Sequence, residues 1–244
     1  MVFTIAEGQN QPIAILPAPI MDFPQTIYDR LLQFTLFQGM SRADLMEVMG
    51  HTKFGFDKQT ANKRIIKEGD ASTQIVFLTS GVIQSETSSD DHAYHVIETF
   101  SAPHIIQPER LFGLTQRYTS TYKTMTDCNF LSIDKEEIFL LLETQFVFRL
   151  NLLNILATQS QRATHHPWRS VPTTIRKRLV RFFADHCYYP AGPKTFYILM
   201  QRLADELNDS RLDVSRILNQ MQSEGLLVLH RGRIEIPQLE RLLM

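Results

Sequence analysis

The sequence of 244 residues predicts an α+β protein, in which a small β-barrel or β-sandwich precedes a long helix and a C-terminal helical motif with a β-wing. Short β-type runs divided by turn residues occupy residues 64–133. A strongly apolar helical pattern comes next, over 136–161, and two short amphipathic helices joined by a three-residue turn occupy 200–222. The rest of the chain is organised around this C-terminal motif.

The C-terminal motif shows the spacing of a helix-turn-helix. Leu203, Ala204 and Leu207 form the apolar side of its first helix. In the second helix, apolar residues recur at the helical period at Val214, Ile217, Leu218 and Met221. Asn208 in the intervening turn tolerates the left-handed conformation that such a turn requires. Ser210 is predicted to cap the second helix, with Asp213 as the acidic member of a capping box.

The opposite face of the second helix is polar and cationic, and it carries Arg211, Leu212, Ser215, Arg216 and Asn219. Arginine can bind the O6 and N7 atoms of guanine, asparagine can read adenine, and an exposed leucine suits a thymine methyl group. A surface helix of an unrelated small bundle would show the same periodicity. The last segment of the chain favours the DNA-reading interpretation, because a strand over 226–229, a turn at Arg231-Gly232 and a strand over 233–236 form a two-stranded wing.

The first half of the chain changes period at residue 51. Residues 27–50 are predicted to be helical around a break at Gln38-Gly39, with Ser41 capping the second segment. Beyond them, strands are predicted over residues 64–67, 74–78, 82–86, 94–99 and 129–133, and turn residues such as Ser80-Gly81 separate them.

The helix predicted over 136–161 has almost no polar side in its middle, from Phe146 to Ala157. A helix that is apolar all round is buried all round. One face can pack on the barrel and another on the same helix of a second copy, so this helix is a candidate dimer helix; a single core helix in a monomer is the alternative. Another helix, over 173–186, leads from Pro172 to the C-terminal motif.

Composition sets limits on the function. The chain is 43% hydrophobic and 21% charged with a net charge of −1, as in an ordinary soluble protein. Residues 171–244 hold eleven Lys and Arg against eight Asp and Glu, whereas fourteen face eighteen in the remainder. This asymmetry is compatible with a C-terminal end that binds DNA.

The two cysteines, Cys128 and Cys187, are far apart, which excludes a cysteine-ligated zinc site or iron–sulfur cluster and favours a reducing cytoplasm. Residues 1–24 lack a basic start and contain four prolines, so we expect an irregular extension rather than a signal peptide or membrane span. We expect no enzymatic activity, because no Gly-rich phosphate loop, metal-ligand spacing or Ser/His/Asp arrangement is recognisable.

In their order along the chain, several motifs resemble those of the CRP/FNR family of bacterial transcription regulators. Residues 36–41 (LFQGMS) resemble the family's entry helix, and residues 66–70 (IKEGD) and 77–82 (FLTSGV) resemble turns of its β-roll. The long helix and residues 209–218 (DSRLDVSRIL) complete the match, which extends from about residue 31 onward.

The resemblance implies an N-terminal double-stranded β-helix, which is jelly-roll-like and similar to cyclic-nucleotide-binding sensor domains, then a dimerisation helix and a C-terminal winged helix-turn-helix. The implied divisions are an extension over 1–25, the sensor over 26–134, the helix and hinge over 135–168, and the winged domain over 169–244. Carried over by position, Arg211, Leu212 and Arg216 fall where members of the family read bases, and Ser210 and Asp213 lie near phosphates. Leu212 departs from the family's usual glutamate, so the half-site should differ.

The effector is not evident. In family members that bind cyclic nucleotides, a Gly-Glu-Leu stretch and an Arg-Ser or Arg-Thr pair hold the phosphate. The corresponding positions here resemble Gln107-Pro108-Glu109 and Tyr118-Thr119, where proline removes one N–H group and tyrosine supplies no charge. Arg110 or Arg117 could substitute, but we expect no cyclic-nucleotide binding.

Haem and iron–sulfur clusters are not expected either. His92, His95 and His104 lie in the sensor region, but isolated histidines are more often surface or core residues. The N-terminal cysteines of the family's iron–sulfur sensors are absent. Aromatic residues could line an apolar pocket, although at strand spacing they usually form core; these are Tyr94, Phe100, Phe112, Tyr118 and Tyr122.

The leading hypothesis is a cytoplasmic, homodimeric transcription regulator that binds palindromic double-stranded DNA, dimerises through the helix over 143–162 and has no membrane partner. RNA polymerase is a further candidate partner. In this hypothesis Arg211 and Arg216 read bases, and Arg231 and Arg233 of the wing, with Ser210 and Asn219, contact the backbone. The alternative is a ligand-binding regulatory module whose winged domain contacts a protein partner.

Overall fold

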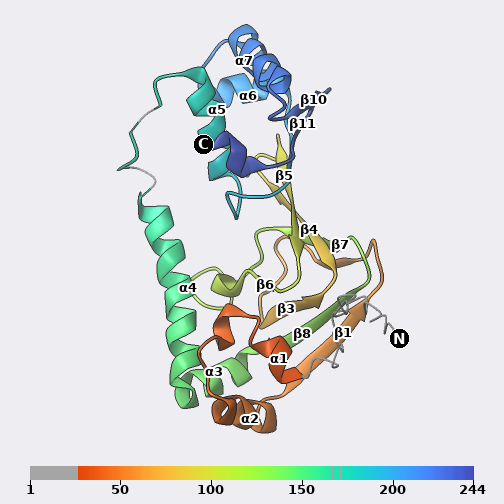
Figure 1. Ribbon diagram of the computed structural model, residues 1–244, viewed down its shortest axis with the longest axis vertical. Coiled ribbons are helices and arrows are strands. Elements are labelled where there is room, and N and C mark those ends of the chain that lie inside the picture. The colour runs from red at the N-terminus through yellow and green to blue at the C-terminus, as the bar shows by residue number, and fades with distance from the viewer. Residues whose placement is uncertain (1–26, 166–167, 171) are drawn as a thin grey trace, which may run out of the picture.

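The computed structural model describes residues 27–165, 168–170 and 172–244. The chain has an α+β fold, in which an antiparallel β-roll is followed by helices and a C-terminal helix-turn-helix (Figure 1). The helices are α1 (Ile27–Leu31), α2 (Arg42–His51), α3 (Lys135–Thr144), α4 (Phe146–His165), α5 (Ile175–Asp185), α6 (Met200–Leu207) and α7 (Arg211–Ser223). The extension predicted over 1–25 lies outside the described residues.

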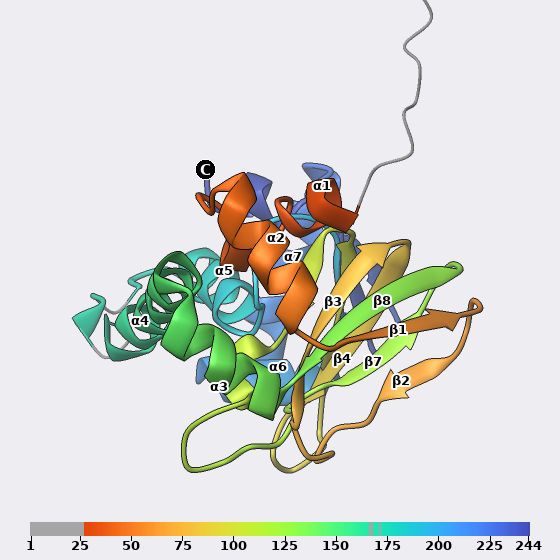
Figure 2. The ribbon, with the colours of Figure 1, turned by 90° about the horizontal axis from the view of Figure 1, so that it is seen from below.

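The strands form two antiparallel sheets. One has the order β1-β8-β3-β6 and the other has the order β10-β11-β9-β5-β4-β7-β2. Their bounds are β1 (Phe54–Gln59), β2 (Arg64–Ile66), β3 (Gln74–Ser80), β4 (Val82–Ser88), β5 (His95–Ser101), β6 (His104–Ile106), β7 (Thr121–Thr124), β8 (Cys128–Asp134), β9 (Lys194–Tyr197), β10 (Val228–His230) and β11 (Arg233–Ile236). Strands β1 to β8 make up the roll, which Figure 2 shows from below with α3 and α4 to one side of the strands.

The predicted strands of the roll are present with small shifts at their ends, as β2, β3, β4, β5 and β8. Burial alternates along β4 and β5 as the two-residue period requires. Gly81 has a φ of +96°, and a Cβ there would lie 2.5 Å from the Asp127 carbonyl oxygen, so the turn between β3 and β4 requires glycine. Strands β1, β6, β7 and β9 were not predicted; β1 is mostly exposed, and the other three have only three or four residues each.

The helices below the roll enclose one hydrophobic core. Ser41 caps α2 in a complete capping box with Asp44, which confirms the predicted cap. Phe37 lies between Phe77 of β3 and Phe148 of α4, with ring centroids 5.8 and 5.3 Å away. The α4 helix is thereby packed against the roll and its entry helices.

The single helix predicted over 136–161 was wrong, because α3 and α4 are separate helices bent by 115° at Gln145. Leu141 of α3 and Phe148 of α4 both belong to one buried cluster, so the two helices pack on the same core on either side of the bend. Complete burial was also wrong: Phe146, Leu150 and Leu153 are 65%, 44% and 56% exposed.

The C-terminal part packs three helices on a small sheet. Thr174 caps α5, and its buried Leu179, Phe182 and Phe183 meet the apolar faces of α6 and α7. Strand β9 pairs with β11 on one side and with β5 of the roll on the other, so one sheet runs through both parts of the chain (Figure 1). Within the described residues, no single helix is long and apolar enough to cross a membrane, and only the bent α3–α4 pair meets those criteria together.

Candidate nucleic-acid interface

Helices α6 and α7 cross at a tight turn that local sequence determines. Leu203, Ala204 and Leu207 of α6 are buried, as are Val214 and other apolar residues of α7. Asn208 adopts the left-handed conformation with φ of 51°, and its N–H group donates to the carbonyl oxygens of Ala204 and Asp205. The predicted helix-turn-helix is therefore present, with the turn residue in the predicted conformation.

The start of α7 is capped by Ser210, whose hydroxyl oxygen accepts a hydrogen bond from the Asp213 N–H at 3.1 Å. The predicted capping box is incomplete. The Asp213 carboxylate accepts from the Ser210 hydroxyl at 2.7 Å rather than from its backbone N–H. Its other oxygen faces Arg216, whose Nη2 lies 3.2 Å away, so Asp213 links the cap to the exposed face of the helix.

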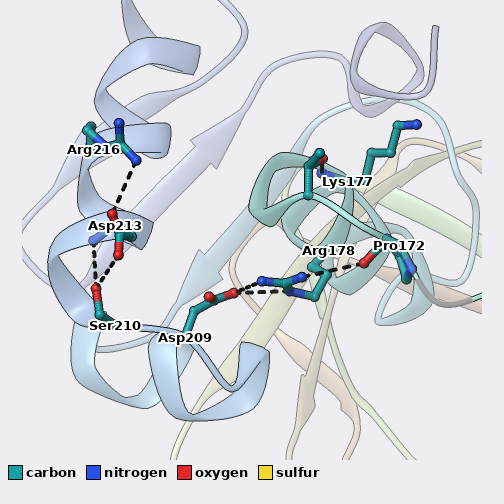
Figure 3. A network of polar contacts seen from close by, with 8 residues as sticks. Pro172, Lys177, Arg178, Asp209, Ser210, Asp213 and Arg216 are labelled. Atoms are coloured by element: carbon teal, nitrogen blue, oxygen red, sulfur yellow. Dashed lines mark hydrogen bonds and ion pairs between the residues drawn. The ribbon is translucent and has the colours of Figure 1, made fainter.

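An arginine of α5 stabilises the turn between α6 and α7. The Arg178 guanidinium donates two hydrogen bonds to Asp209 Oδ2, one of them from Nε at 3.0 Å, and its Nη1 donates to the Pro172 carbonyl oxygen at 3.4 Å (Figure 3). Both side chains are largely shielded, at 28% and 17% exposure. Charge-assisted bonds of this kind are about twice as strong as neutral ones. Arg178 and Asp209 therefore position the cap of α7, although neither was a predicted site residue.

The outward face of α7 carries the predicted reading residues together. Leu212 is 83% exposed and the Arg216 side chain is 72% exposed, with Arg211 also exposed beside them. Asn219 is exposed, but its amide donates to the Ser215 carbonyl oxygen at 2.8 Å, so its donors are partly engaged within the helix. Arg211 and Arg216, in the first half of α7, are therefore more available to bind a partner than Asn219.

The wing is formed by β10 and β11 around a turn at Arg231 and Gly232. Arg231 is exposed at the tip. Arg233 lies on β11 and forms an ion pair with Glu235 at 3.1 Å, so its guanidinium is less available than that of Arg231. The wing was predicted as two strands, but β9 adds a third behind it.

The segment of the roll between β6 and β7 is closed by its own side chains. Gln107 is buried in a left-handed conformation, and its amide oxygen accepts from the Thr119 N–H at 3.0 Å. Its amide nitrogen donates to the hydroxyls of Thr119 and Ser120 at 2.8 and 3.2 Å. Arg117 donates to the Gly69 carbonyl oxygen at 2.7 Å, whereas Arg110 lies 3.9 Å from its neighbour Glu109 and its buried Nε makes no hydrogen bond within the described residues. The side chains of Gln107 and Arg117 are therefore engaged by other groups of the roll.

The candidate histidine ligands are dispersed. His104 is buried and stacked on Phe100 at 4.4 Å, and burial lowers its pKa to about 4. His95 stacks on Tyr197 at 4.6 Å, whereas His92 is exposed. Among the described residues, no group of three or more His, Cys, Asp or Glu side chains is placed to hold a metal ion.

Two family models match the chain. A model of the cyclic nucleotide-binding domain matches residues 58–145, and a model of the Crp-like helix-turn-helix domain matches residues 177–244. Together they cover more than half of the sequence, and both parts lie where the roll and the helix-turn-helix are found. No curated protein matches the chain in a sequence search.

Solved structures that match the chain do so at low sequence identity. The catabolite activator protein of Thermus thermophilus is 18% identical, with 86% of this chain and 96% of that chain covered and a TM-score of 0.46. DNR from Pseudomonas aeruginosa is 19% identical, with 91% and 98% covered and a TM-score of 0.44. The c-di-GMP-responsive regulator CLP from Xanthomonas campestris is 18% identical, with 80% and 99% covered and a TM-score of 0.43.

Proposed function

Because this chain belongs to the CRP/FNR family of DNA-binding transcription regulators, we propose that it acts as a homodimer on palindromic duplex DNA. The observation that carries the proposal is the outward face of α7, where Arg211, Leu212 and Arg216 project together from a capped helix. Two such helices related by a twofold axis would read half-sites about one helical turn, roughly 34 Å, apart.

The contacts divide into base-reading and backbone-positioning groups. Arg211 and Arg216 suit guanine, each with about 1–3 kcal/mol of discrimination, and Leu212 suits a thymine methyl group. Arg231 at the wing tip and the capping segment at Ser210 lie where backbone contacts are made in this kind of motif. The Asp213 carboxylate restrains Arg216 at 3.2 Å, which limits the rotamer entropy that binding would cost.

The dimer proposal rests on an exposed stripe of α4. Phe146, Leu150, Leu153 and Ala157 are exposed and recur at intervals of four, three and four residues. This is the spacing of a coiled-coil seam, which a second helix of the same kind covers. The stripe lies within the 143–162 segment expected to dimerise, and large apolar side chains left in water favour association.

We infer that the roll does not hold a cyclic nucleotide in the family's usual manner. Gln107 bonds to Thr119, one of the two positions that resemble the family's phosphate-holding pair, and to the adjacent Ser120. Pro108 lacks the N–H group that would help to bind a phosphate. The signal for this regulator would therefore be another ligand or a partner.

The test is a selection from random duplexes with the purified protein at moderate salt and without added ligand. A palindromic motif is the expected outcome, and its half-site reports on Leu212 directly. Arg216→Ala should lose discrimination between the selected site and random duplex. Ser223→Ala should retain it, because Ser223 is exposed at the far end of the same helix and its hydroxyl donates to the Gln220 carbonyl oxygen within that helix.

The alternative is a winged domain that contacts a protein, favoured by the 83% exposure of Leu212 at the centre of the reading face. Salt separates the two functions, because duplex affinity governed by phosphate neutralisation falls steeply as salt rises. Equal retention of every duplex by the wild type, with no salt dependence, would contradict DNA binding and favour the protein partner.

A further inference from the structure

The C-terminal part from α5 onward, here called the winged part, is joined to the roll by the pairing of strands β5 and β9. His95, Val96, Ile97 and Glu98 of β5 face Tyr197, Phe196, Thr195 and Lys194 of β9 in antiparallel register. Tyr94 and Val96 of the roll belong to the hydrophobic cluster formed by α5, α6 and α7. Arg202 of α6 also forms an ion pair with Asp91 in the β4–β5 hairpin at 3.0 Å. The winged part is therefore held against the roll rather than merely tethered to it.

Glu98 is the polar centre of this joint. It is 3% exposed, and its Oε1 lies 2.7 Å from the Lys194 ammonium, which is also 3% exposed. Its Oε2 accepts the Tyr188 backbone N–H at 2.9 Å. Both carboxylate oxygens of a roll residue are thus occupied by the winged part, and the second of these bonds fixes the backbone of Tyr188.

The Tyr188 side chain extends from the winged part onto the roll. It packs against the roll's inner hydrophobic cluster, edge-on to Phe100 and His104 at 6.3 and 6.5 Å. Its hydroxyl oxygen accepts a hydrogen bond from Gln159 Nε2 of α4 at 2.9 Å. Burial, with the Glu109 carboxylate nearby, raises the pKa of the phenol above its ordinary value, so the group is neutral. One aromatic ring therefore connects the roll, α4 and the winged part.

A cleft of about 840 Å³ leads to this ring from solvent. It lies between the roll, α4 and the winged part, and Gln33, Arg110, Thr158, Arg162, Tyr188 and Tyr189 are among its lining residues. A small molecule in this cleft would meet the edge of Tyr188 and the Gln159 amide together.

We propose that the pocket occupied by the Tyr188 side chain is a ligand site. A neutral aromatic alcohol about the size of phenol competes with this side chain for the pocket. The chemistry of the place selects this class. The walls are aromatic, and Gln159 offers a donor to a hydroxyl oxygen. Burial and Glu109, which accepts from the same amide at 3.2 Å, raise the pKa of the Tyr188 phenol more than Arg162 of the cleft lowers it, so the neutral form is favoured here.

Occupancy of this site releases the winged part. A ligand that enters only when Tyr188 has left stabilises the state in which the joint at Glu98 is open. Such a ligand would be the signal for the proposed regulator. Only the effect of the ligand on DNA binding rests on the proposed function. Ligand binding at this site and release of the winged part from the roll do not require DNA.

The first experiment measures binding of 4-methylphenol, which has the atoms of a tyrosine side chain, by calorimetry. Tyr188→Ala should bind it at least tenfold more tightly than wild type, because wild type must first expel its own ring. Phe56→Ala is the control for loss of an aromatic ring, since Phe56 is 69% exposed on β1, away from this cleft, and should leave the affinity unchanged. The anion 4-methylbenzoate should bind Tyr188→Ala at least tenfold more weakly than the phenol. Equal affinities of the wild type and Tyr188→Ala would overturn the site.

The second experiment uses wild type alone and reads the joint through Cys187. Burial, with Glu98 nearby, raises the pKa of this thiol to about 12, so it is unreactive while the joint is closed. Iodoacetamide labelling followed by peptide mass mapping should show Cys187 alkylation rising at least threefold with millimolar 4-methylphenol, while the buried Cys128 stays constant. An unchanged Cys187 rate under saturating 4-methylphenol would overturn the release.

Neither measurement contains DNA. A failed duplex selection would contradict the proposed function and leave the site standing. A failed phenol or labelling result would contradict the site and leave DNA binding standing.

Discussion

Replacing Glu98 with glutamine should be among the most destabilising single changes at the joint between the two parts of the chain. The substitution keeps the shape of the side chain but removes the only charge that compensates Lys194 within ion-pair distance among the described residues. With both groups 3% exposed, water cannot replace the lost partner. Removal of one member of a buried ion pair costs about 3–5 kcal/mol, because the remaining charge stays in a poorly solvated place.

The double variant Glu98→Gln with Lys194→Met separates this cause from a general disturbance of packing. Without either charge, the desolvation cost disappears with the attraction, and stability should return to within about 1–2 kcal/mol of wild type. The single changes should therefore be strongly non-additive, as expected for residues in direct contact.

The assay is equilibrium urea unfolding at neutral pH followed by circular dichroism. Total stabilities of about 5–15 kcal/mol leave room to measure a loss of this size. Arg176→Gln is the control, because it breaks an ion pair with Glu224 whose side chains are 39% and 36% exposed, and it should cost less than about 1 kcal/mol. If Glu98→Gln cost no more than this control, or if the double variant were no more stable than the single one, the buried pair would not be what holds the joint.

Three further predictions concern other parts of the molecule. Arg178→Met should lower the free energy of unfolding by about 2 kcal/mol, because it leaves the shielded Asp209 carboxylate without its cation; Arg176→Met is its control in urea unfolding. Stability should fall by up to about 3 kcal/mol as pH drops from about 6.5 to 4, because His104 takes up its proton readily only when unfolded; His104→Gln should flatten that slope. Leu153→Asp should weaken the proposed dimer at least 100-fold, since each copy loses one buried leucine, measured by light scattering at several concentrations.

Each of these three has an outcome that contradicts it. Equal costs for the two arginine changes would remove Arg178 from the support of the helix-turn-helix. A pH slope that persists in His104→Gln would assign it to other groups. Asn154→Asp, also exposed on α4 but off the stripe, should leave the dimer intact, and equal effects at 153 and 154 would place the interface elsewhere.

Features governed by neighbouring residues were predictable from the sequence. The left-handed turn at Asn208, the cap at Ser210 and the burial of Val214 result from conformational preference and helical period. The bend at Gln145 was not predictable in this way, because no glycine or proline marks it. The two helices pack on one buried cluster on either side of the bend, and that packing depends on where the roll lies.

The support of the candidate site was also invisible in the sequence. Arg178 and Asp209 are 31 positions apart, and a charged residue on a helix and one in a turn carry no mark of partnership. The same holds for Gln107, whose bonds to Thr119 and Ser120 close the segment in which a phosphate site was sought.

By itself the sequence determined most of the elements and their order, the family, and the cationic face of α7, because periodicity, caps and turn residues act over a few positions. Only the tertiary structure decided that β9 joins β5, that Glu98 meets Lys194 across 96 positions, and that Tyr188 fills a place on the roll. Such contacts depend on burial and on the mutual placement of distant segments, and the local pattern of residues contains neither.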